Sequence, residues 1–262
     1  MTRFRQDIFR QPDELERALD YLGGAGRRRL DEAAGVIRRA RHVYLTGIGS
    51  SWHAALCAGP LFSEGARPLY LQDAAELLHF ATFPRDAVIV AISRTGKSME
   101  IVRLLAKARE SGALVIGITN SEDGPLAREA QIPIIVPVTF DHGISVNTYS
   151  TLAAAAGALA SATLSSFDDT LIPILSRAIR EAAQSMAGWE EQLAGTGWLL
   201  PGAIYYFLAR GSSLGSCCEA RLLWEEGVKS PATAMGTGSF RHGLSAGELF
   251  LPLILPARKW WC

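Results

Sequence analysis

Cysteine is scarce in this sequence of 262 residues, which contains four in all. None forms a Cys-x-x-Cys pair, since Cys217 and Cys218 are adjacent and Cys57 and Cys262 lie far from them. This spacing disfavours both a disulfide framework and a zinc site, so no metal is expected. Few cysteines without a pairing pattern fit a reducing compartment, and we expect the protein to be cytoplasmic.

An excess of charge of one sign is also absent. The 26 Lys and Arg residues equal the 26 Asp and Glu residues in number, so the formal net charge is zero. Because affinity for a nucleic-acid backbone comes mainly from positive charge, the composition argues against a nucleic-acid partner.

The sequence has no apolar run of the length that spans a membrane. Its N-terminal stretch MTRFRQDIFRQPDELERAL is charged throughout and lacks the apolar segment of a signal peptide. The alanine-rich run from Leu152 to Leu164 is too short to cross a bilayer, and we predict a buried helix there. A folded protein without a membrane partner is therefore expected.

The sequence does contain an alternation of short β-branched apolar runs with longer helical stretches. This alternation is typical of parallel strands joined by crossover helices, so it predicts an α/β fold. One such helix is SMEIVRLLAKARESG, which begins at Ser98 and ends at Gly112. The predicted strands are HVYLTG from His42, PLYL from Pro68, AVIVAIS from Ala87, LVIGIT from Leu114, PIIVPV from Pro133 and AIYYFLA from Ala203.

Two stretches of the sequence are similar to each other, VYLTGIGSSWHAAL from Val43 and IYYFLARGSSLGSC from Ile204. Each has the pattern of a strand, a Gly-Ser-Ser turn and a helix, so the pair predicts two homologous α/β halves. Chance similarity is the alternative, since Gly-Ser-Ser is a common turn sequence. We predict a helical arm over 1–40, a first domain over 41–165, a helical connector over 166–197 and a partial second domain over 198–262.

A cluster of hydroxyl side chains follows the predicted strand AVIVAIS, in the loop Ser93-Arg94-Thr95-Gly96-Lys97-Ser98. Such a loop offers hydroxyl donors together with the free N–H groups and positive dipole of a helix N-terminus. These groups favour a phosphate, and α/β proteins bind ligands at the carboxyl ends of their strands. The alternative is that Ser98 only caps its helix while the other hydroxyls face water.

The same segment, AISRTGKS from Ala91, mimics the end of a nucleotide-binding P-loop. Ala91 stands where a P-loop has its first glycine, and it falls inside the apolar strand, where the chain has no flexible cradle for phosphates. No apolar run ending in a magnesium-binding Asp follows, because LVIGIT is followed by Asn120. A P-loop nucleotide-binding protein is therefore the weaker alternative.

Several motifs together resemble the sugar isomerase (SIS) family, in particular the isomerase half of the glutamine–fructose-6-phosphate aminotransferases. The family's Gly-Thr-Ser-Tyr-His segment matches Gly49 to His53, and its Ser-Gln-Ser-Gly-Glu-Thr loop matches Ser93 to Ser98. Its Arg-Gly pair, Glu-bearing helix and Lys-His-Gly motif match Arg210-Gly211, Glu219 to Glu226 and Arg241-His242-Gly243. The resemblance implies a flavodoxin-like three-layer domain with a five-stranded parallel sheet, followed by a second, incomplete α/β unit of the same kind.

The resemblance also implies a role for each matching residue. Glu226 would be the base that moves a proton between C1 and C2 of an open-chain sugar phosphate, and His242, borrowed from a neighbouring subunit, would assist ring opening. A carboxylate and an imidazole are the groups that such proton transfers require. Without the family motifs, Glu226 would be interpreted as an exposed helix end. The residues predicted to bind the phosphate and the sugar are Ser50, Ser51, Ser93, Arg94, Thr95, Ser98, Asn147, Thr148 and Glu219.

The sequence departs from the family pattern at several places. The segment from Val146 to Tyr149 stands where the family has a Ser-Thr-Lys motif, Ser239 replaces a family glutamate, and His53 fits a packing role as well as a ligand contact. No glutaminase part precedes the matching region, so ammonia release from glutamine is not expected. The resemblance ends after Gly243, and we hypothesise a truncated or frame-shifted second domain that ends in LSAGELFLPLILPARKWWC.

These observations predict an enzyme of the aldose–ketose isomerase or deaminase type that acts on an amino sugar phosphate or a glycated amino acid phosphate. The expected ligand is a sugar phosphate of the fructose 6-phosphate or glucosamine 6-phosphate class, and the expected assembly is a homodimer. The resemblance implies no cofactor. The alternative from a different class is a phosphosugar sensor without catalysis, in which Glu226 and His242 would have no task.

Overall fold

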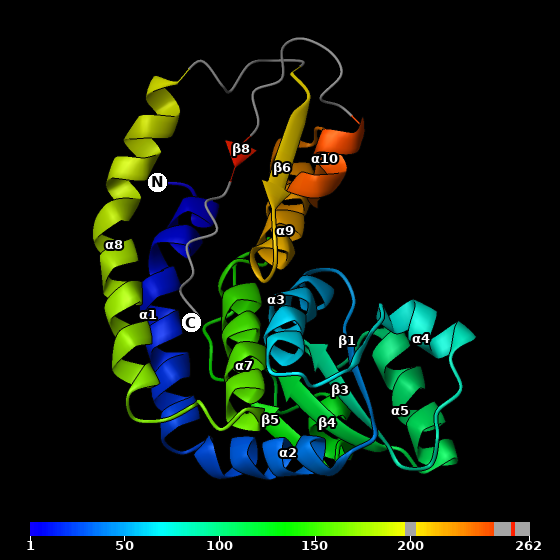
Figure 1. Cartoon of the computed structure of the whole chain (residues 1–262). Coiled ribbons are helices and arrows are strands. Elements are labelled where there is room, and N and C mark those ends of the chain that lie inside the picture. The colour runs from blue at the N-terminus through cyan, green and yellow to red at the C-terminus, as the bar shows by residue number, and fades with distance from the viewer. Residues whose placement is uncertain (197–202, 244–252, 255–262) are drawn as a thin grey trace.

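The structure is a computed structural model that describes residues 1–196, 203–243 and 253–254. In this part of the chain a five-stranded sheet precedes a three-stranded sheet, and helices pack around both (Figure 1). All strand pairs are parallel, so the predicted α/β class is confirmed. The strands of the first sheet are β1 (His42–Thr46), β2 (Tyr70–Leu71), β3 (Ala87–Ser93), β4 (Leu114–Thr119) and β5 (Ile132–Ile135).

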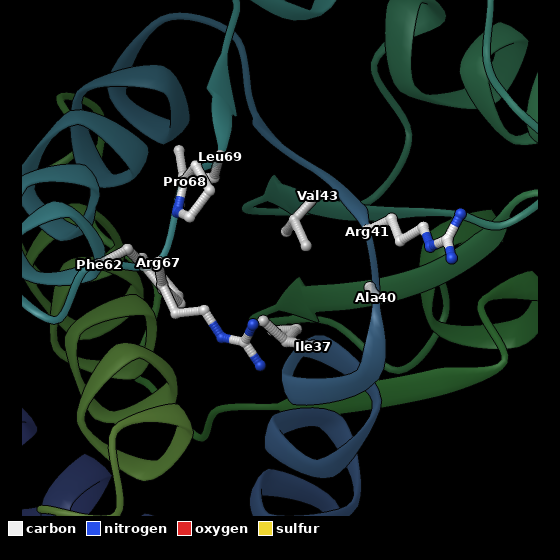
Figure 2. Close-up of a pocket in the computed structure, with 8 residues that line it drawn as sticks. All are labelled: Ile37, Ala40, Arg41, Val43, Phe62, Arg67, Pro68 and Leu69. Atoms are coloured by element: carbon white, nitrogen blue, oxygen red, sulfur yellow. The ribbon is translucent and has the colours of Figure 1, made fainter.

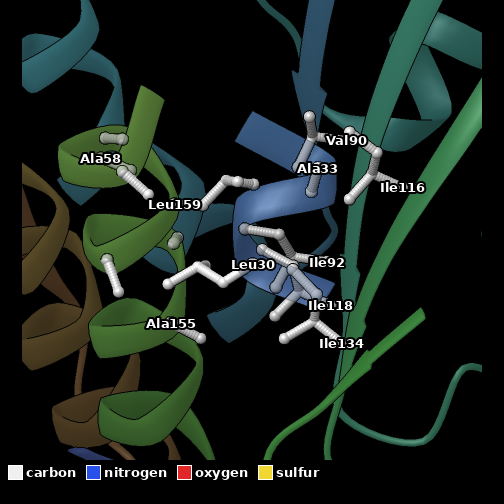
Figure 3. Close-up of a cluster of buried hydrophobic side chains, with 14 of the residues drawn as sticks. Leu30, Ala33, Ala58, Val90, Ile92, Ile116, Ile118, Ile134, Ala155 and Leu159 are labelled. Carbon is white, nitrogen blue, oxygen red and sulfur yellow. The ribbon is translucent and has the colours of Figure 1, made fainter. Parts of the chain in front are cut away.

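Helices cover both faces of the first sheet, which gives the predicted three layers. Successive side chains of a strand point to opposite faces, so β3 sends Val90 and Ile92 into one apolar core and Ile89 and Ala91 into the other. Figure 3 shows the first core, where α2 and α7 meet the sheet. The helices are α1 (Arg3–Gly23), α2 (Arg27–Arg39), α3 (Ser50–Glu64) and α7 (Asn147–Thr163) on the first face, and α4 (Ala74–Phe80), α5 (Met99–Ser111) and α6 (Pro125–Glu129) on the second.

The strand order β2-β1-β3-β4-β5 makes the chain change direction between β1 and β3. The chain adds β2 on one side of β1 and then returns to add β3, β4 and β5 on the other side. In sheets of this flavodoxin-like order, ligands bind outside the carboxyl ends of the two strands at the change of direction. The register runs from His42 beside Ala87 to Thr46 beside Ala91, so the segments after β1 and β3 begin close together.

The second sheet has three strands among the described residues, in the order β7-β6-β8. Gly49 after β1 and Gly211 after β6 both have a positive φ, of 57° and 53°, and a helix follows each. Glycine adopts this backbone without the steric cost of a Cβ. The predicted repeat thus has a structural counterpart. The elements are α8 (Leu171–Gly195), β6 (Tyr205–Ala209), α9 (Ser213–Val228), β7 (Ala232–Gly236), α10 (Thr237–Gly243) and β8 (Leu253–Ile254).

The first helix begins close to the N-terminus, within the predicted helical arm. α1 begins at Arg3, and Pro12 lies inside it. Thr2 explains the early start, because its side-chain oxygen accepts a hydrogen bond from the backbone N–H of Arg5 at 3.2 Å and caps the helix.

Four strands are shorter than predicted: β1 ends at Thr46 rather than at Gly47, β6 begins at Tyr205 rather than at Ala203, and β2 and β5 are shortened beside prolines. β2 begins at Tyr70 rather than at Pro68, since proline has no N–H to give to the ladder, and β5 ends at Ile135 before Pro137 for the same reason. The division into 1–40, 41–165, 166–197 and 198–262 stays a prediction. Most of the apolar C-terminal sequence, Trp260 and Trp261 included, lies outside the described residues.

The predicted buried helix around the alanine-rich run is confirmed as α7. It packs against α1, α2 and α3, and nearly all of its side chains are buried. Within the described ranges, no helix is both long enough and apolar enough to cross a membrane.

The core contacts of α2 predict that this helix stabilises the first sheet and its core, and that it is not a loosely attached arm. Leu30 is fully buried between α7 and the sheet, whereas Arg28 on the same helix is exposed. Leu30→Ala is expected to lower the free energy of unfolding by about 2–5 kcal/mol, since it leaves a cavity. Urea denaturation measures this change. Arg28→Ala is the control, and a loss for Leu30→Ala as small as that of the control would show that α2 does not stabilise the core.

Candidate functional site

The candidate site lies at the carboxyl ends of β1 and β3, where two predicted loops meet. The segment after β1 leads into α3 at Ser50, and the segment after β3 runs from Ser93 to the start of α5. Because β1 and β3 are hydrogen-bonded neighbours, both segments leave the sheet at the same edge. The structure therefore brings the two predicted hydroxyl clusters to one place, the position at which this fold class binds ligands.

The loop after β3 is held by its own hydroxyl groups. Ser93 Oγ accepts a hydrogen bond from the Gly96 N–H at 3.1 Å and lies 3.3 Å from Ser98 Oγ. The Lys97 N–H donates to Thr95 Oγ1 at 3.3 Å. The two serine hydroxyls thus come together from opposite ends of the loop.

The N-terminus of α5 is not capped by a side chain. Ser98 occupies the cap position with extended backbone angles, but its hydroxyl accepts no hydrogen bond from the helix. The alternative in which Ser98 acts only as the helix cap is therefore wrong. The first N–H groups of α5 and its positive dipole remain available to an acceptor from outside the helix.

Arg94 adds a positive charge to this loop. Its guanidinium donates to Ser145 Oγ at 3.2 Å, and its backbone oxygen accepts hydrogen bonds from Asn120 N–H and Thr119 Oγ1 at 3.1 and 3.2 Å. No carboxylate in the described part of the chain forms an ion pair with Arg94. A guanidinium without a carboxylate partner beside two converging hydroxyls is suited to an anion.

The other predicted contact residues near β1 differ in exposure. Ser50 is half-buried at the first position of α3, whereas Ser51 is 6% exposed and its N–H donates to the Ile48 carbonyl at 3.2 Å. Of the two, Ser50 is the side chain more open to a ligand.

Glu219 lies in the interface between the two units, on α9. Its Oε2 is 2.7 Å from His53 Nδ1, and both side chains are buried. Glu219 Oε1 has no hydrogen-bond partner among the described residues. The sequence groups Glu219 with the sugar contacts, but it does not predict His53 as its partner, because the two residues are far apart in the chain and only the packing of α9 on α3 joins them.

A second polar cluster joins the same helices. Tyr149 O–H donates to Ser216 Oγ at 3.2 Å, and Cys57 Sγ lies 3.3 Å from the tyrosine oxygen. Burial raises the pKa of the Cys57 thiol and raises that of the Tyr149 hydroxyl well above its usual value. Both groups are therefore neutral near pH 7 and serve as hydrogen-bond donors that connect α3, α7 and α9.

Glu226 is exposed near the C-terminal end of α9, seven residues after Glu219. The next residue, Gly227, faces the segment that precedes α7, since a Cβ on Gly227 would lie 3.6 Å from Ile144 Cδ1. Ile144 is followed by Ser145, which binds Arg94. Ile144 and Ser145 thus connect the end of α9 with the loop from Ser93 to Ser98.

His242 is not brought to this place by the fold of one chain. It is exposed on α10, and α10 lies beyond β6 and α9, away from the five-stranded sheet (Figure 1). The two predicted catalytic residues therefore stand on different parts of the second unit.

Asn147 and Thr148 are fully buried at the start of α7. The Asp141 carboxylate accepts hydrogen bonds from the backbone N–H groups of both residues, from Asn147 Nδ2 and from Thr148 Oγ1, at 2.7–3.0 Å. Their side chains shape the segment before α7, and the roles predicted for them in sugar binding stay predictions.

A cavity of about 250 Å³ lies at the opposite edge of the sheet, at the amino ends of β1 and β2. Figure 2 shows apolar side chains around it, with the Arg67 guanidinium reaching toward Ile37. Since Arg67 donates to the Arg38 carbonyl, it closes the end of α2 there. This cavity is separate from the hydroxyl loops.

In the described ranges no group of three or more His, Cys, Asp or Glu side chains is arranged to hold a metal ion.

Comparison with known proteins identifies a family match within the first part of the chain. The family model of the SIS domain matches residues 36–162. The glutamine–fructose-6-phosphate aminotransferase (isomerizing) of Pyrobaculum aerophilum is 23% identical over 249 residues, which cover 91% of this chain and 40% of that protein. The chain thus spans about two-fifths of the length of this relative.

Solved structures share the fold. The C-terminal domain of glucosamine-fructose-6-phosphate aminotransferase from Francisella tularensis has a TM-score of 0.77 and 19% identity, covering 92% of this chain and 72% of that one. Glucosamine-6-phosphate deaminase from Thermotoga maritima has a TM-score of 0.79 and 19% identity, covering 97% and 76%. Residues 36–162, from the end of α2 to the end of α7, therefore match the SIS domain family.

Proposed function

We propose that this chain binds a sugar phosphate at the carboxyl ends of β1 and β3, with the phosphate on the loop from Ser93 to Ser98. The observation that carries the proposal is the uncapped N-terminus of α5, where the hydroxyls of Ser93 and Ser98 lie 3.3 Å apart. Helix N-H groups and hydroxyl donors together stabilise a phosphate dianion. Arg94, which has no carboxylate partner in the described part of the chain, would add a charge-assisted hydrogen bond.

The names of the relatives suggest the class of sugar. One is an aminotransferase of fructose 6-phosphate, and one of the solved structures is a deaminase of glucosamine 6-phosphate. We infer that this chain takes an amino sugar phosphate, or the phosphate of a glycated amino acid. Ser50 and Ser51 after β1 would contact the phosphate or the sugar beside it.

Glu226 is the proposed base. In an aldose–ketose interconversion, a carboxylate removes the proton from C2 or C1 of the open-chain sugar phosphate, which leaves an enediolate. A proton then passes between the C1 and C2 oxygens, and the carboxylic acid returns its proton to the neighbouring carbon. The placement of Gly227 beside Ile144 supports this role, since it holds the end of α9 next to the segment that binds Arg94. Buried Glu219, fixed on His53, sets the position of α9 on α3.

His242 is proposed to act in a second copy of the chain. Its place on α10, away from the five-stranded sheet, favours an arrangement in which a homodimer completes each site. An imidazole can carry a proton near neutral pH, so it would open the sugar ring before Glu226 acts.

A phosphosugar sensor is the second candidate. The observation that favours it is that Glu226 and His242 are both exposed and stand on different helices, α9 and α10, of which α10 lies away from the five-stranded sheet. Binding without turnover distinguishes the sensor from the enzyme.

The phosphate site predicts ligand-dependent stabilisation. Fructose 6-phosphate or glucosamine 6-phosphate is expected to stabilise the chain by about 2.7 kcal/mol at a concentration of about 100 times Kd, because it binds only the folded state. A thermal melt measures the rise in Tm, and Arg94→Ala should reduce it. Lys97→Ala is the matched control in the same loop. Equal shifts from fructose and its phosphate, or Mg-ATP binding that Lys97→Ala abolishes, would contradict the assignment.

The base assignment predicts a separation of binding from chemistry. Glu226→Gln should keep the affinity for the sugar phosphate but abolish exchange of the C1 or C2 proton with deuterated water, because an amide keeps the shape without the basicity. Proton NMR follows the exchange. Glu225→Gln is the control, since Glu225 pairs with Arg221 at 2.8 Å. Unchanged exchange in Glu226→Gln would exclude this residue as the base, and a wild-type chain that binds without exchange would be a sensor.

The shared site predicts complementation between two inactive variants. Chains with Glu226→Gln and chains with His242→Asn each lack one group, so mixed dimers would contain one complete site. Some exchange activity should therefore return on mixing under conditions that allow subunits to exchange. If no activity returns although mixed dimers form, His242 does not serve the site of a neighbouring copy.

A further inference from the structure

A stripe of charged side chains on α1 faces the segment before α7, with its two carboxylates buried, Arg10 partly buried and Arg17 exposed. Asp7, Arg10, Glu14 and Arg17 follow one another at intervals of three, four and three residues, which places them on one face of the helix. Asp7 is 1% exposed and Glu14 is 3% exposed. Aspartate and glutamate are almost never this buried without partners, so the partners show what the stripe does. We name these four residues the α1 clamp.

Asp7 makes the most buried contacts of the clamp. Its carboxylate accepts a hydrogen bond from the His142 backbone N–H at 2.9 Å and lies 2.8 Å from His142 Nδ1. Its backbone oxygen accepts from Asn147 Nδ2 at 3.0 Å. Arg10, one turn later, pairs with the same carboxylate at 2.9 Å. All these partners outside α1 belong to the segment 139–148, which leads into α7.

The rest of the clamp holds the start of the same segment. Glu14 accepts a hydrogen bond from the Thr139 N–H at 3.1 Å, and Arg17 donates to Thr139 Oγ1 at 3.1 Å. Arg10 donates to the carbonyl oxygens of Thr139 and Phe140, each at 3.3 Å. The carboxylates of the clamp thus accept hydrogen bonds from backbone N–H groups of the segment, and the Arg10 guanidinium donates to its backbone carbonyls. The clamp therefore supplies the hydrogen-bond partners that a helix or strand would otherwise provide.

The far end of the clamped segment reaches the candidate site. Ser145 accepts the hydrogen bond from Arg94 at 3.2 Å, and Ile144 faces Gly227 next to Glu226. Between the clamp and Ser145, the Asp141 side chain is fully buried and accepts the N–H groups of the first turn of α7. The segment is therefore fixed at both ends, and only two residues separate His142 from Ser145.

The charge of the Asp7 carboxylate stabilises its contact with His142. Burial alone would raise the pKa of this carboxyl group, but the hydrogen bonds from the His142 N–H and imidazole, together with the charge of Arg10, hold its pKa below the ordinary value. The carboxylate is therefore charged at neutral pH and accepts from both His142 donors.

We propose that Asp7 is a positioning residue of the phosphate site: through His142 and the segment 139–148 it fixes Ser145, and Ser145 orients the Arg94 guanidinium toward the phosphate. The proposal rests on the proposed function, because it assigns to Arg94 a bound sugar phosphate. In this proposal α1 raises the affinity for the sugar phosphate in addition to stabilising the fold. Neither Asp7 nor His142 touches the ligand.

The test is a double-mutant cycle on affinity for fructose 6-phosphate, measured by isothermal calorimetry. Asp7→Asn leaves one His142 donor without an acceptor and is expected to weaken binding about tenfold, whereas Asp7→Glu should recover part of the affinity. In the Arg94→Ala background, Asp7→Asn should change the affinity less than about twofold, since its effect passes through Arg94. Asp13→Asn, exposed on the same helix, is the control and should bind as wild type does.

A structural role without positioning gives a different result. Asp7→Asn would then lower the Tm while its affinity below the Tm stayed that of the wild type, or it would weaken binding equally in both backgrounds, and either result overturns the proposal. If Asp7→Asn does not fold, Ser145→Ala cuts the same connection without touching the buried carboxylate, and wild-type affinity in Ser145→Ala would overturn it. A wild-type chain that does not bind fructose 6-phosphate or glucosamine 6-phosphate refutes the proposed function itself, and the positioning role with it.

Discussion

The pairing of β1 with β3 is the constraint on which the candidate site depends. Because the chain changes direction between these strands, no helix crosses directly over their carboxyl ends, and the two segments that follow diverge to opposite faces of the sheet, into α3 and α5. The hydroxyl groups of the β3 loop then face the space that the divergence leaves. Ser93 and Ser98 lie 3.3 Å apart there without capping α5, and Ser93 also accepts the Gly96 N–H, so the first N–H groups of α5 stay free of a side-chain partner.

The second requirement is that α9 be held on the first unit, and this packing depends on small and polar groups. Gly215 allows the close approach, because a Cβ there would lie 2.5 Å from both the Cys57 sulfur and the His53 carbonyl oxygen. The buried contact of Glu219 with His53 leaves one carboxylate oxygen without a partner in the described part of the chain, which costs stability. An apolar pair would pack α9 on α3 at lower cost, so the polar pair is better explained by the orientation it imposes on α9 than by stability.

The fold was predictable from local signals, and much of the site was not. Strands such as AVIVAIS and LVIGIT alternate with amphipathic helices, and this pattern alone indicates a parallel sheet. The Ser93–Ser98 loop was predictable too, since its position between strand and helix is a property of neighbouring residues. The partnership of Glu219 with His53 arises from tertiary packing between distant segments, and no local pattern contains it. The stripe from Asp7 to Arg17 resembles an ordinary solvated helix face until the segment 139–148 is placed against it.

The clamp shows why a segment without regular structure can nevertheless be precise. Residues 139–146 form neither a helix nor a strand, so their backbone groups find no partners in a ladder. Asp7 and Glu14 supply acceptors, Arg10 and Arg17 supply donors, and Asp141 caps α7 from within the segment. Each of these contacts involves a charged group, and charge-assisted hydrogen bonds are shorter and stronger than neutral ones. The segment beside Arg94 is thus held by charged groups of α1, a helix whose apolar side packs into the core on the first face of the sheet, so contacts from outside the sheet fix a segment next to the candidate site.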